Sequence, residues 1–415
     1  MTTAATPTVE IATVADLAAI HTLRLAQGWS ATDEVVRAVM QWERGRMFVI
    51  RESALAASGE PARRRERTRI ADGSDAADKV GATLDALDAL DALDALDAPV
   101  VTVGAIAAGP VGMIGSVIVR DDYQRRGLGR YSMGYALDWL REMGVRAVYL
   151  DATPAGRPLY TSLGFVSLGA HSWFTLTPLA TIDHAALAQR AEGLRAVSVD
   201  TSDANAVASA FTRLAALDGA AFGGDRLGLV AALAQRPNHH LYVVDDISGA
   251  PAGYLVAYPT GERYHGLRVG PWVATSQAAA AATLLAALQT ADEWLPPQAS
   301  LLDDAETGLP TSPEGAPAGR REGRRDERYD GPQMVLSLPG TNPQALELLR
   351  AIGCKLVLDD LMMRLDLRAP RADEAETGAA TGGENATRAG SSPQTAPRLD
   401  DDPTLVYAWM ASMVF

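Results

Sequence analysis

The hydrophobic positions of this chain repeat in two ways, at every second residue or at steps of three and four residues. The first pattern is typical of a half-buried strand, and the second is typical of an amphipathic helix. The clearest helical pattern covers residues 127–143, where large apolar side chains fall on one face: Leu128, Tyr131, Tyr135, Trp139 and Met143. Gly144 follows the last of them and is expected to end the helix.

The same patterns divide each half of the chain into a series of elements. In the first half, strands are expected at residues 9–13, 46–51, 100–108, 111–120 and 147–151 and from residue 165, and helices at residues 15–27, 32–43, 127–143 and 157–163. In the second half, strands are expected at residues 240–245, 252–257, 267–273, 334–338 and 356–367, and helices at residues 277–289 and 343–352. The order strand, helix, strand, short helix ending in glycine, strand occurs in both halves. This order indicates an internal duplication.

Three segments differ from the rest in composition and do not resemble a packed core: residues 52–97, 296–330 and 369–402. The first contains an arginine-rich patch and a repeated Asp-Ala-Leu triplet. A repeat of three moves its leucines around a helix, so no continuous apolar face forms. We interpret these segments as flexible surface insertions, disordered at about residues 53–98, 296–330 and 369–402. An interaction tail is the alternative interpretation of the first.

Length and charge narrow the class of protein. A chain of 415 residues is expected to form two domains, and a net charge of −14 disfavours nucleic acids and anionic membranes as partners. The single cysteine, Cys354, can form no disulfide within the chain and no cysteine-rich metal site. The first residues do not resemble a secretory signal, and no apolar run is long enough to span a membrane. We therefore expect a cytoplasmic protein.

A strand, a loop and the start of a helix follow one another over residues 117–130, and the loop contains Gly127 and Gly129. Such a junction presents unpaired backbone N–H groups at the positive end of a helix dipole, which suits a pyrophosphate. Glycine allows the phosphate to approach the backbone closely. A dinucleotide-binding fold is a rival interpretation, with Asp151 as the ribose-binding acid. Ser132 at the third glycine position and the long loop before Gly127 argue against it.

These residues resemble the GNAT superfamily of N-acetyltransferases, whose acetyl-CoA loop reads Gln/Arg-x-x-Gly-x-Gly/Ala. The segment Gln124-Arg125-Arg126-Gly127-Leu128-Gly129, followed by Arg130, matches each fixed position. Downstream, residues 158–165 resemble the family segment Leu-Tyr-x-x-Leu-Gly-Phe. The resemblance implies an α/β (α+β) fold with two GNAT-like domains, each a mixed, mostly antiparallel sheet flanked by helices. We place the first domain at residues 8–180 and the second at residues 190–415.

The resemblance also implies roles for individual residues. Acetyl-CoA would be the co-substrate, without a metal, and the strand residues Val117, Ile118 and Val119 would lie beside it through their backbone groups. Tyr160 would protonate the departing thiolate. A phenol with a pKa near 10 is protonated at neutral pH and can therefore act as this acid. Packing against the sheet is the alternative interpretation of Tyr160.

No general base is assigned. The candidates are Asp121, Asp122, Asp151 and His21, and for each a capping or solvated role is the alternative.

The second half lacks the residues that the first half offers to a cofactor. Aligning the short helices on their terminal glycines places Leu349 opposite Tyr160 and Cys354 opposite Phe165. The turn after Val273 has neither glycine nor arginine. The arrangement resembles tandem GNAT proteins with a degenerate second domain, in which residues 222–226 and 270–274 resemble recurring segments. Asp225 and Arg226 could equally form a structural ion pair.

The function that follows is acetyl transfer from acetyl-CoA to a small-molecule amine or an amino terminus, by direct attack on the thioester. A non-catalytic acyl-CoA-binding sensor and an interaction protein built on the insertions are the alternatives. The second half has three interpretations: it lines the substrate pocket, it forms a homodimer interface, or it only stabilises the first half. Acceptor specificity lies in loops that no motif identifies.

Overall fold

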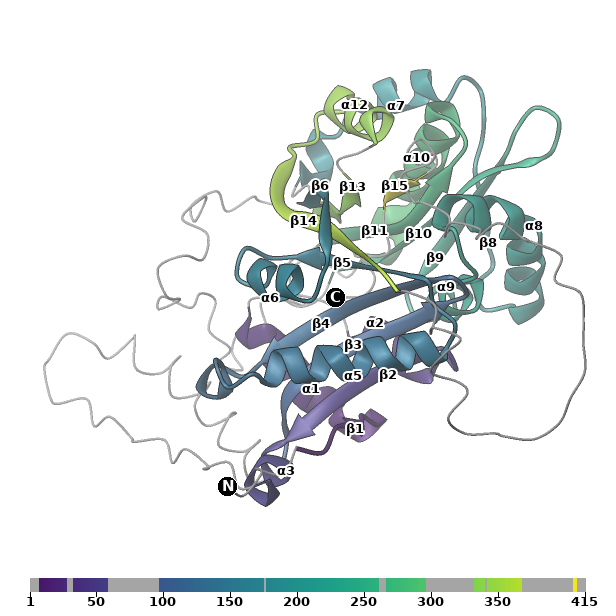
Figure 1. The fold of residues 1–415 in the computed structure, drawn as a ribbon. Helices are drawn as coiled ribbons and strands as arrows, with labels where there is room; N and C mark the ends of the chain where they lie inside the picture. Colours follow the sequence, from purple (N-terminus) through teal and green to yellow (C-terminus); the bar gives the residue numbers. More distant parts are fainter. Residues whose placement is uncertain are drawn as a thin grey trace, which may run out of the picture.

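The computed structural model describes residues 7–27, 33–58, 97–174, 177–260, 266–295, 332–339, 342–367 and 406–408. These residues form two sheets with helices on both faces of each (Figure 1). The fold class is therefore the expected one, with two GNAT-like units of mixed, mostly antiparallel sheet. Within the described residues, no helix combines the length and the apolar character needed to cross a membrane.

The first sheet has eight strands, and only the pair β4 and β5 is parallel. In spatial order they are β1 (Glu10–Ile11), β2 (Gly45–Arg51), β3 (Pro99–Ala108), β4 (Val111–Val119), β5 (Ala147–Ala152), β14 (Val357–Asp366), β6 (Val166–Phe174) and β13 (Leu338–Pro339). Along β3 every residue is buried, because helices cover both faces.

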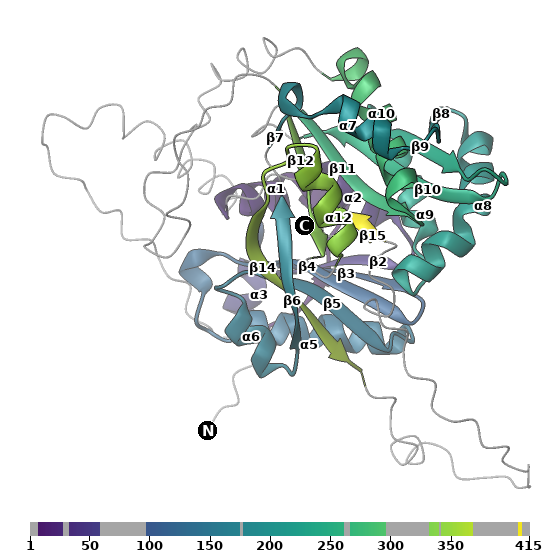
Figure 2. The same cartoon turned by 90° about the horizontal axis from the view of Figure 1, so that it is seen from above.

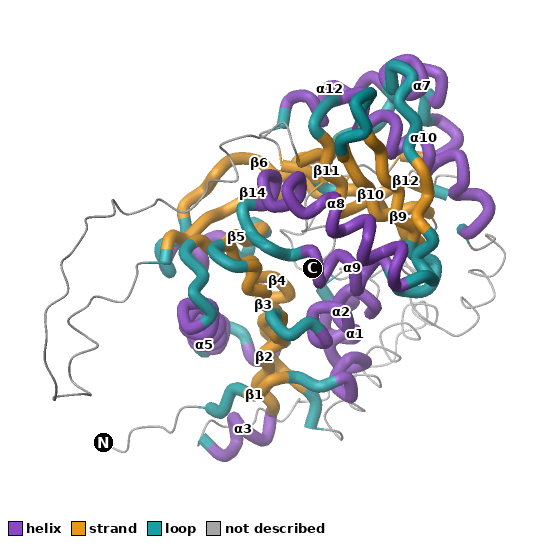
Figure 3. Tube along the Cα trace, turned by 90° about the vertical axis from the view of Figure 1, so that its right-hand side faces the viewer, coloured by secondary structure: helices purple, strands orange, loops and turns teal. Residues whose placement is uncertain are grey.

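The helices around this sheet lie on opposite faces. Figure 3 shows α5 (Leu128–Glu142) on one face and α1 (Leu17–Ala26) and α2 (Asp33–Gln41) on the other. The inner face of α5 buries Met133, Ala136, Leu137 and Leu140. The predicted apolar face is therefore wrong by about one position along the helix, because only Leu128 of its residues is buried and Tyr135 is 45% exposed. Two shorter helices, α3 (Glu52–Ala57) and α6 (Arg157–Ser162), lie near the ends of the strands.

The second sheet has six strands in one path and a seventh beside it. The path is β7 (Thr177–Pro178), β12 (Gln333–Leu336), β11 (Gly266–Ala274), β10 (Pro251–Pro259), β9 (His240–Asp245) and β8 (Val197–Val199), and β15 (Val406–Ala408) pairs with β11. Its helices are α7 (His184–Arg190), α8 (Ala204–Phe222), α9 (Leu227–Ala234), α10 (Gln277–Trp294) and α12 (Pro343–Ala351). Alternate side chains of β10 face α8 on one side and α10 on the other.

Most expected elements are present within a few residues of their predicted limits, and the order of elements in the two halves agrees. The short strands β7, β8 and β15 and the helices α7, α8 and α9 were not predicted. The first residues of the predicted insertion at 52–97 form α3, so this part is not a flexible insertion. Residues 59–96, 296–331 and 368–405, which hold the remainder of the three predicted insertions, lie outside the described residues.

The two sheets exchange strands across the expected domain division at residues 180–190. β14, from the C-terminal half, lies between β5 and β6 in the first sheet, with Leu361 opposite both Ala152 and Ala170. β7, which follows β6 in the chain, pairs with β12 in the second sheet. Figure 2 shows β14 and β6 side by side within the first sheet. The first sheet is therefore continuous only when the C-terminal half is present.

One hydrophobic core joins the two halves. It contains Val39 of α2 and Met113 of β4 together with Phe211 of α8 and Leu229 of α9. Gly224 lies against the carbonyl of Ala108, where an added Cβ would come within 2.0 Å of the oxygen. The next backbone N–H, of Asp225, donates to the same carbonyl at 3.1 Å. The segment at residues 222–226 therefore attaches the second half to the hairpin of β3 and β4.

Arg226 forms a fully buried ion pair, but its partner is Asp218 of α8 and not the neighbouring Asp225. The Arg226 Nη2 lies 2.8 Å from Asp218 Oδ1, and both side chains have no exposed surface. The Tyr254 hydroxyl also donates to Asp218 at 2.5 Å. A buried charge without its partner is costly, so this pair fixes how α8 and α9 pack on the sheet.

We expect Asp218→Asn to lower the free energy of unfolding by about 3 to 5 kcal/mol, because it leaves the Arg226 guanidinium buried without a counter-charge. The measurement is urea unfolding followed by circular dichroism. Asp245→Asn is the matched control, since the Asp245–Arg213 pair is largely exposed and its loss should cost at most about 1 kcal/mol. Equal effects of the two substitutions would contradict the structural role of the buried pair.

Candidate active site

The parallel strands β4 and β5 separate partway along their length. Their pairing runs from Val111 opposite Ala147 to Met113 opposite Tyr149 and then stops, although β4 continues to Val119. The backbone edge of β4 beyond Met113 therefore lacks a strand partner on the β5 side. Such an edge can pair with an extended ligand in the manner of an added strand.

A bulge in β4 lies at this point of separation. Ser116 has a φ of 46°, and the register with β3 shifts between Gly104 and Thr102. The Thr102 hydroxyl donates to the Ser116 carbonyl at 2.8 Å, which holds the bulge in place. An extra residue in one strand bends that strand and re-aims its side chains. Here the bend turns the end of β4 away from β5.

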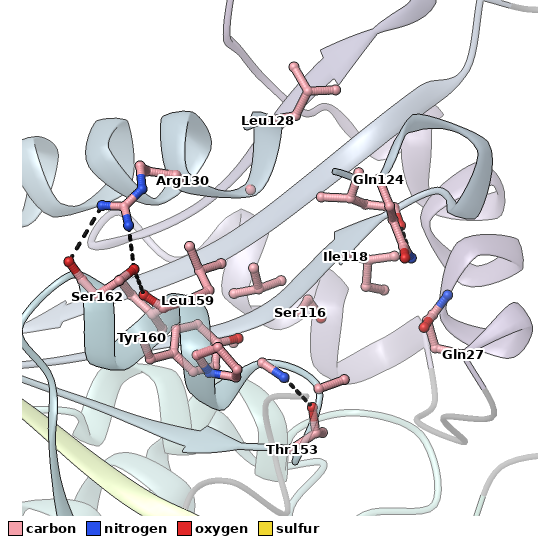
Figure 4. A pocket seen from close by; sticks show the side chains of 18 of the residues that line it. Gln27, Ser116, Ile118, Gln124, Leu128, Arg130, Thr153, Leu159, Tyr160 and Ser162 are labelled. Carbon is pink, nitrogen blue, oxygen red and sulfur yellow. Dashed lines mark hydrogen bonds between the residues drawn. The ribbon is translucent and has the colours of Figure 1, made fainter. Parts of the chain in front are cut away.

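A pocket of about 640 Å³ occupies the space between the separated strands. Its walls are β4, the loop before α5, the first turn of α5, the end of β5 and α6 (Figure 4). Most of the predicted cofactor residues line it: Val117, Ile118, Val119, Gln124, Arg125, Gly127, Leu128, Gly129 and Arg130. Tyr160 lines it as well, so the two motifs that the sequence places about thirty residues apart share one cavity.

The loop before α5 has the backbone of an anion site. Arg125 has a φ of 63° and Gly127 a φ of 81°, so both are left-handed. α5 begins at Leu128 and its N-cap, Gly127, provides no side-chain cap. An added Cβ on Gly127 would meet nothing within 4 Å, so the loop is open toward the pocket. The N–H groups of the first turn are therefore available to a phosphate at the positive end of the helix dipole.

Two predicted residues have a structural role in the loop. The Gln124 side-chain amide donates to the Val119 carbonyl at 3.0 Å and to Asp121 at 2.7 Å, so it closes the loop onto the end of β4. Arg126 does not line the pocket. Its guanidinium donates to the Asp122 carbonyl at 2.9 Å and stacks over the Tyr123 ring.

Tyr123 is a lining residue that the sequence did not identify. Its ring lies between the guanidinium groups of Arg120 and Arg126, at 4.6 and 4.7 Å from the ring centre. Its hydroxyl donates to Glu52 of α3. Burial, followed by the hydrogen bond to Glu52, raises the pKa of Tyr123 well above its ordinary value. Tyr123 therefore supports the loop as a neutral, stacked ring.

Arg130 connects the anion loop to the helix that carries Tyr160. Its guanidinium donates to the Ser162 hydroxyl and lies 3.5 Å from the Ser162 carbonyl (Figure 4). The Ser162 hydroxyl in turn donates to the Leu159 carbonyl at 2.6 Å. These contacts fix the distance between α5 and α6, and so between the two predicted parts of the site.

Tyr160 is held firmly in α6 and is only 7% exposed. Its ring packs edge-on against Phe165, and an added Cβ on Gly156 would come within 2.7 Å of the ring. Burial raises the pKa of the Tyr160 phenol above its ordinary value, and the carboxylates of Asp360 and Asp151 raise it further. The phenol therefore stays protonated at neutral pH. Tyr160 packs on the core, as one interpretation of the sequence expects, and it also lines the pocket. Its role as a proton donor stays a prediction.

Of the candidate bases, only Asp151 lines the pocket, whereas His21, Asp121 and Asp122 do not. Two further polar residues near Asp151 were not identified from the sequence. Asp360 of β14 lines the same pocket, and His171 of β6 has its Nδ1 2.6 Å from Asp151 Oδ1. No sequence signal connects these residues, because three strands from distant parts of the chain bring them together. Within the described residues, no group of three or more candidate ligands is arranged to hold a metal ion.

The second sheet separates its parallel strands in the same way, but there the gap is filled. β11 pairs with β12 from Gly266 to Val269, and its later residues, Trp272 and Val273, pair with β15 instead. Leu349, which corresponds to Tyr160 when the two short helices are aligned, is fully buried. Cys354 corresponds to Phe165, and burial raises the pKa of its thiol to about 12. The position that corresponds to the open edge of β4 is therefore taken by the chain itself.

Comparisons with known proteins agree with this architecture. Residues 92–165 match the acetyltransferase (GNAT) family. No curated protein sequence gives a match. Among solved structures, a putative acetyltransferase from Pyrococcus horikoshii is similar over 98% of this chain and 95% of its own, with 16% identity and a TM-score of 0.54.

Two other solved structures are similar at lower scores. A tandem GNAT protein from the clavulanic acid biosynthesis pathway covers 86% of this chain and 98% of its own, with 11% identity and a TM-score of 0.45. A GCN5-related N-acetyltransferase from Anabaena variabilis covers 86% and 72%, with 14% identity and a TM-score of 0.45.

The fold and the pocket define a two-unit α/β protein with an open edge between two parallel strands and, beside it, a loop with left-handed backbone at the start of α5. The chain carries the acetyltransferase fold of the GNAT superfamily.

We expect Gly127→Ala to lower the free energy of unfolding by about 1 kcal/mol, because a side chain disfavours the left-handed backbone there. Gly134→Ala is the control: Gly134 lies inside α5, and an added Cβ there also meets nothing within 4 Å. This change should instead stabilise by about 0.5 to 1 kcal/mol. Urea unfolding midpoints measure both, and a stabilised Gly127→Ala protein would exclude the left-handed loop.

Proposed function

We propose that this protein is an acetyl-CoA-dependent N-acetyltransferase with one cofactor site, in the pocket between β4 and β5. The observation that carries the proposal is the meeting of three features in one cavity: the unpaired edge of β4, the anion loop at Gly127 and the hydroxyl-bearing ring of Tyr160. A pantetheine arm, a diphosphate and a departing thiolate require these three features respectively.

The residues present fit the parts of acetyl-CoA. Arg125 and Arg130, with the first backbone N–H groups of α5, would hold the diphosphate. The edge of β4 at Val117, Ile118 and Val119 would pair with the pantetheine amides, and a backbone N–H there would polarise the acetyl carbonyl. Acetyl-CoA itself supplies the acetyl group as a thioester. The sulfur end would then lie toward α6 and Tyr160.

In the reaction, the chain positions a neutral amine for direct attack on the thioester carbonyl, without a covalent enzyme intermediate. Tyr160 donates its proton to the departing thiolate. Its raised pKa keeps the proton on the phenol until the thiolate forms, and α6 holds the ring in place through Phe165 and Arg130. A small-molecule amine or an amino terminus is the acceptor class.

A non-catalytic acyl-CoA sensor remains the second candidate, because the anion loop and the open edge serve binding as well as turnover. The position of Tyr160 favours the enzyme. Pure binding needs no proton donor at the sulfur end of the pocket.

We expect the wild-type protein to bind acetyl-CoA. Gly129→Leu should weaken that binding about tenfold, because a side chain there would cost one charge-assisted hydrogen bond between the phosphate and the backbone. An added Cβ on Gly129 already meets Leu159 at 3.4 Å and Val119 at 3.5 Å, so a larger side chain must fill the pocket. Isothermal calorimetry measures the affinity. Gly134→Leu, further along α5, is the control and should leave it unchanged. Unaltered affinity in Gly129→Leu would place the phosphates elsewhere.

Turnover tests the role of Tyr160. Free CoA release is measured with a broad panel of primary amines, and Tyr160→Phe should lower kcat about a hundredfold with little change in acetyl-CoA affinity. Tyr135→Phe is the matched control, because Tyr135 is 45% exposed, packs edge-on against Phe48 and does not line the pocket. If the wild-type protein binds acetyl-CoA but acetylates no amine, the sensor function is supported instead.

A further inference from the structure

The pocket has an acidic end, formed by three strands that meet beside α6. β5 ends at Ala152, β14 pairs with it on one side, and β6 pairs with β14 on the other. Asp151 of β5 and Asp360 of β14 both line the pocket together with Tyr160. The arginines that line the pocket are Arg125 of the loop and Arg130 of α5. No arginine or lysine among the lining residues comes from β5, β6 or β14.

Asp151 is backed by a buried histidine. His171 has no exposed surface, and its Nδ1 lies 2.6 Å from Asp151 Oδ1. The two atoms are close but not aligned as a hydrogen bond. Within the described part of the chain, His171 Nε2 also has no hydrogen-bond partner. A polar ring buried in this way beside a pocket carboxylate is expensive, and such cost is usually tied to function.

Asp360 comes from the other half of the chain. In the register of the sheet it lies opposite His171, two residues before Met362, which lies opposite Asp151. Its side chain is 5% exposed. The exchange of β14 therefore places a second carboxylate at the same end of the pocket as Asp151. Both carboxylates line the pocket together with Tyr160.

The charges of the pocket are therefore separated. Arginines line the loop side, where the diphosphate of the proposed function would bind, and two carboxylates line the side of Tyr160 and the thioester. An ammonium group gains from two nearby carboxylates in a partly buried site, whereas a neutral alcohol gains much less. An acceptor with its own carboxylate next to the amine would be repelled.

We propose that Asp151 and Asp360 bind the acceptor as an ammonium ion, and that Asp151 takes its first proton. The acceptor class is a cationic primary amine with no carboxylate beside the nitrogen. This inference rests on the proposed acetyl transfer and names the acceptor side of the same pocket.

The proton balance is complete. One N–H proton passes to Asp151, and the neutral nitrogen forms the C–N bond while the C–S bond breaks and its electron pair goes to sulfur. Tyr160 gives its proton to the thiolate and recovers one from the new amide nitrogen. The proton on Asp151 leaves to solvent, so the reaction releases one proton in total.

The test measures amine binding to the full-length protein saturated with CoA. Because CoA carries no acetyl group, the amine binds without being acetylated. Isothermal calorimetry compares phenethylamine, n-butylamine and benzylamine with the alcohols of the same carbon skeletons. The wild-type protein should bind at least one amine about tenfold more tightly than its alcohol. Asp360→Asn should lower the affinity for the amine about tenfold and leave the affinities for the alcohol and for CoA unchanged.

Two further variants complete the design. Asp151→Asn tests the second carboxylate by itself, so the inference does not depend on the folding of one variant. Asp366→Asn is the matched control: it removes the same charge from the same strand, at a side chain that is 70% exposed. It should leave the amine affinity unchanged.

The outcomes separate this inference from the proposed function. If the wild-type protein does not bind CoA, the cofactor site itself is wrong. If CoA binds but every amine binds no better than its alcohol, or if neither Asp360→Asn nor Asp151→Asn lowers amine affinity, the acidic end does not bind the acceptor and the inference is overturned.

Discussion

The backbone pairing of β14 between β5 and β6 is the constraint on which the rest of this structure depends. Residues near the C-terminal end of the chain complete a sheet that begins near its N-terminal end, and β7 makes the reverse crossing. Without β14, the buried edges of β5 and β6 would lose their partners, and unpaired backbone groups in a core are costly. The same strand carries Asp360 into the pocket. The pocket of the first sheet is therefore complete only when β14 of the second half is folded into that sheet.

The two sheets share an irregularity and use it differently. In each, a pair of parallel strands separates and exposes the edge of one of them. Beside β4 the edge remains open along the pocket, whereas beside β11 the strand β15 pairs with Trp272 and Val273. An open strand edge accepts whichever extended partner has the matching donors and acceptors. The second copy satisfies its edge from within the chain, which leaves the first copy as the cofactor site of the proposed function.

The pocket places opposite charges near its two ends. The positive end combines left-handed backbone at Arg125 and Gly127 with the dipole of α5, and a stacked Tyr123 supports it from behind. The negative end combines Asp151 and Asp360 around a phenol that stays protonated. The sequence as a whole has a net charge of −14, yet two arginines, Arg125 and Arg130, line this end of the pocket. Local geometry, and not average composition, therefore determines what this pocket can bind.

The sequence by itself determined the elements and motifs that depend on neighbouring residues. The extent of α5, the glycines at its start and the position of Tyr160 in a short helix all follow from spacing within one or two turns, and the structure has each of them. The buried face of α5 does not follow, because the aromatic side chains that the pattern placed on it lie at the edge of the contact with the sheet. The helix α8 was not predicted, although its buried residues Val207, Phe211 and Leu214 recur at steps of four and three residues. Only the tertiary structure decided the partner of Arg226, the exchange of β14, and the meeting of Asp151, His171 and Asp360. The physical reason is that a helix selects its contacts at fixed steps along the chain, whereas a strand can pair with any edge that the whole fold leaves open.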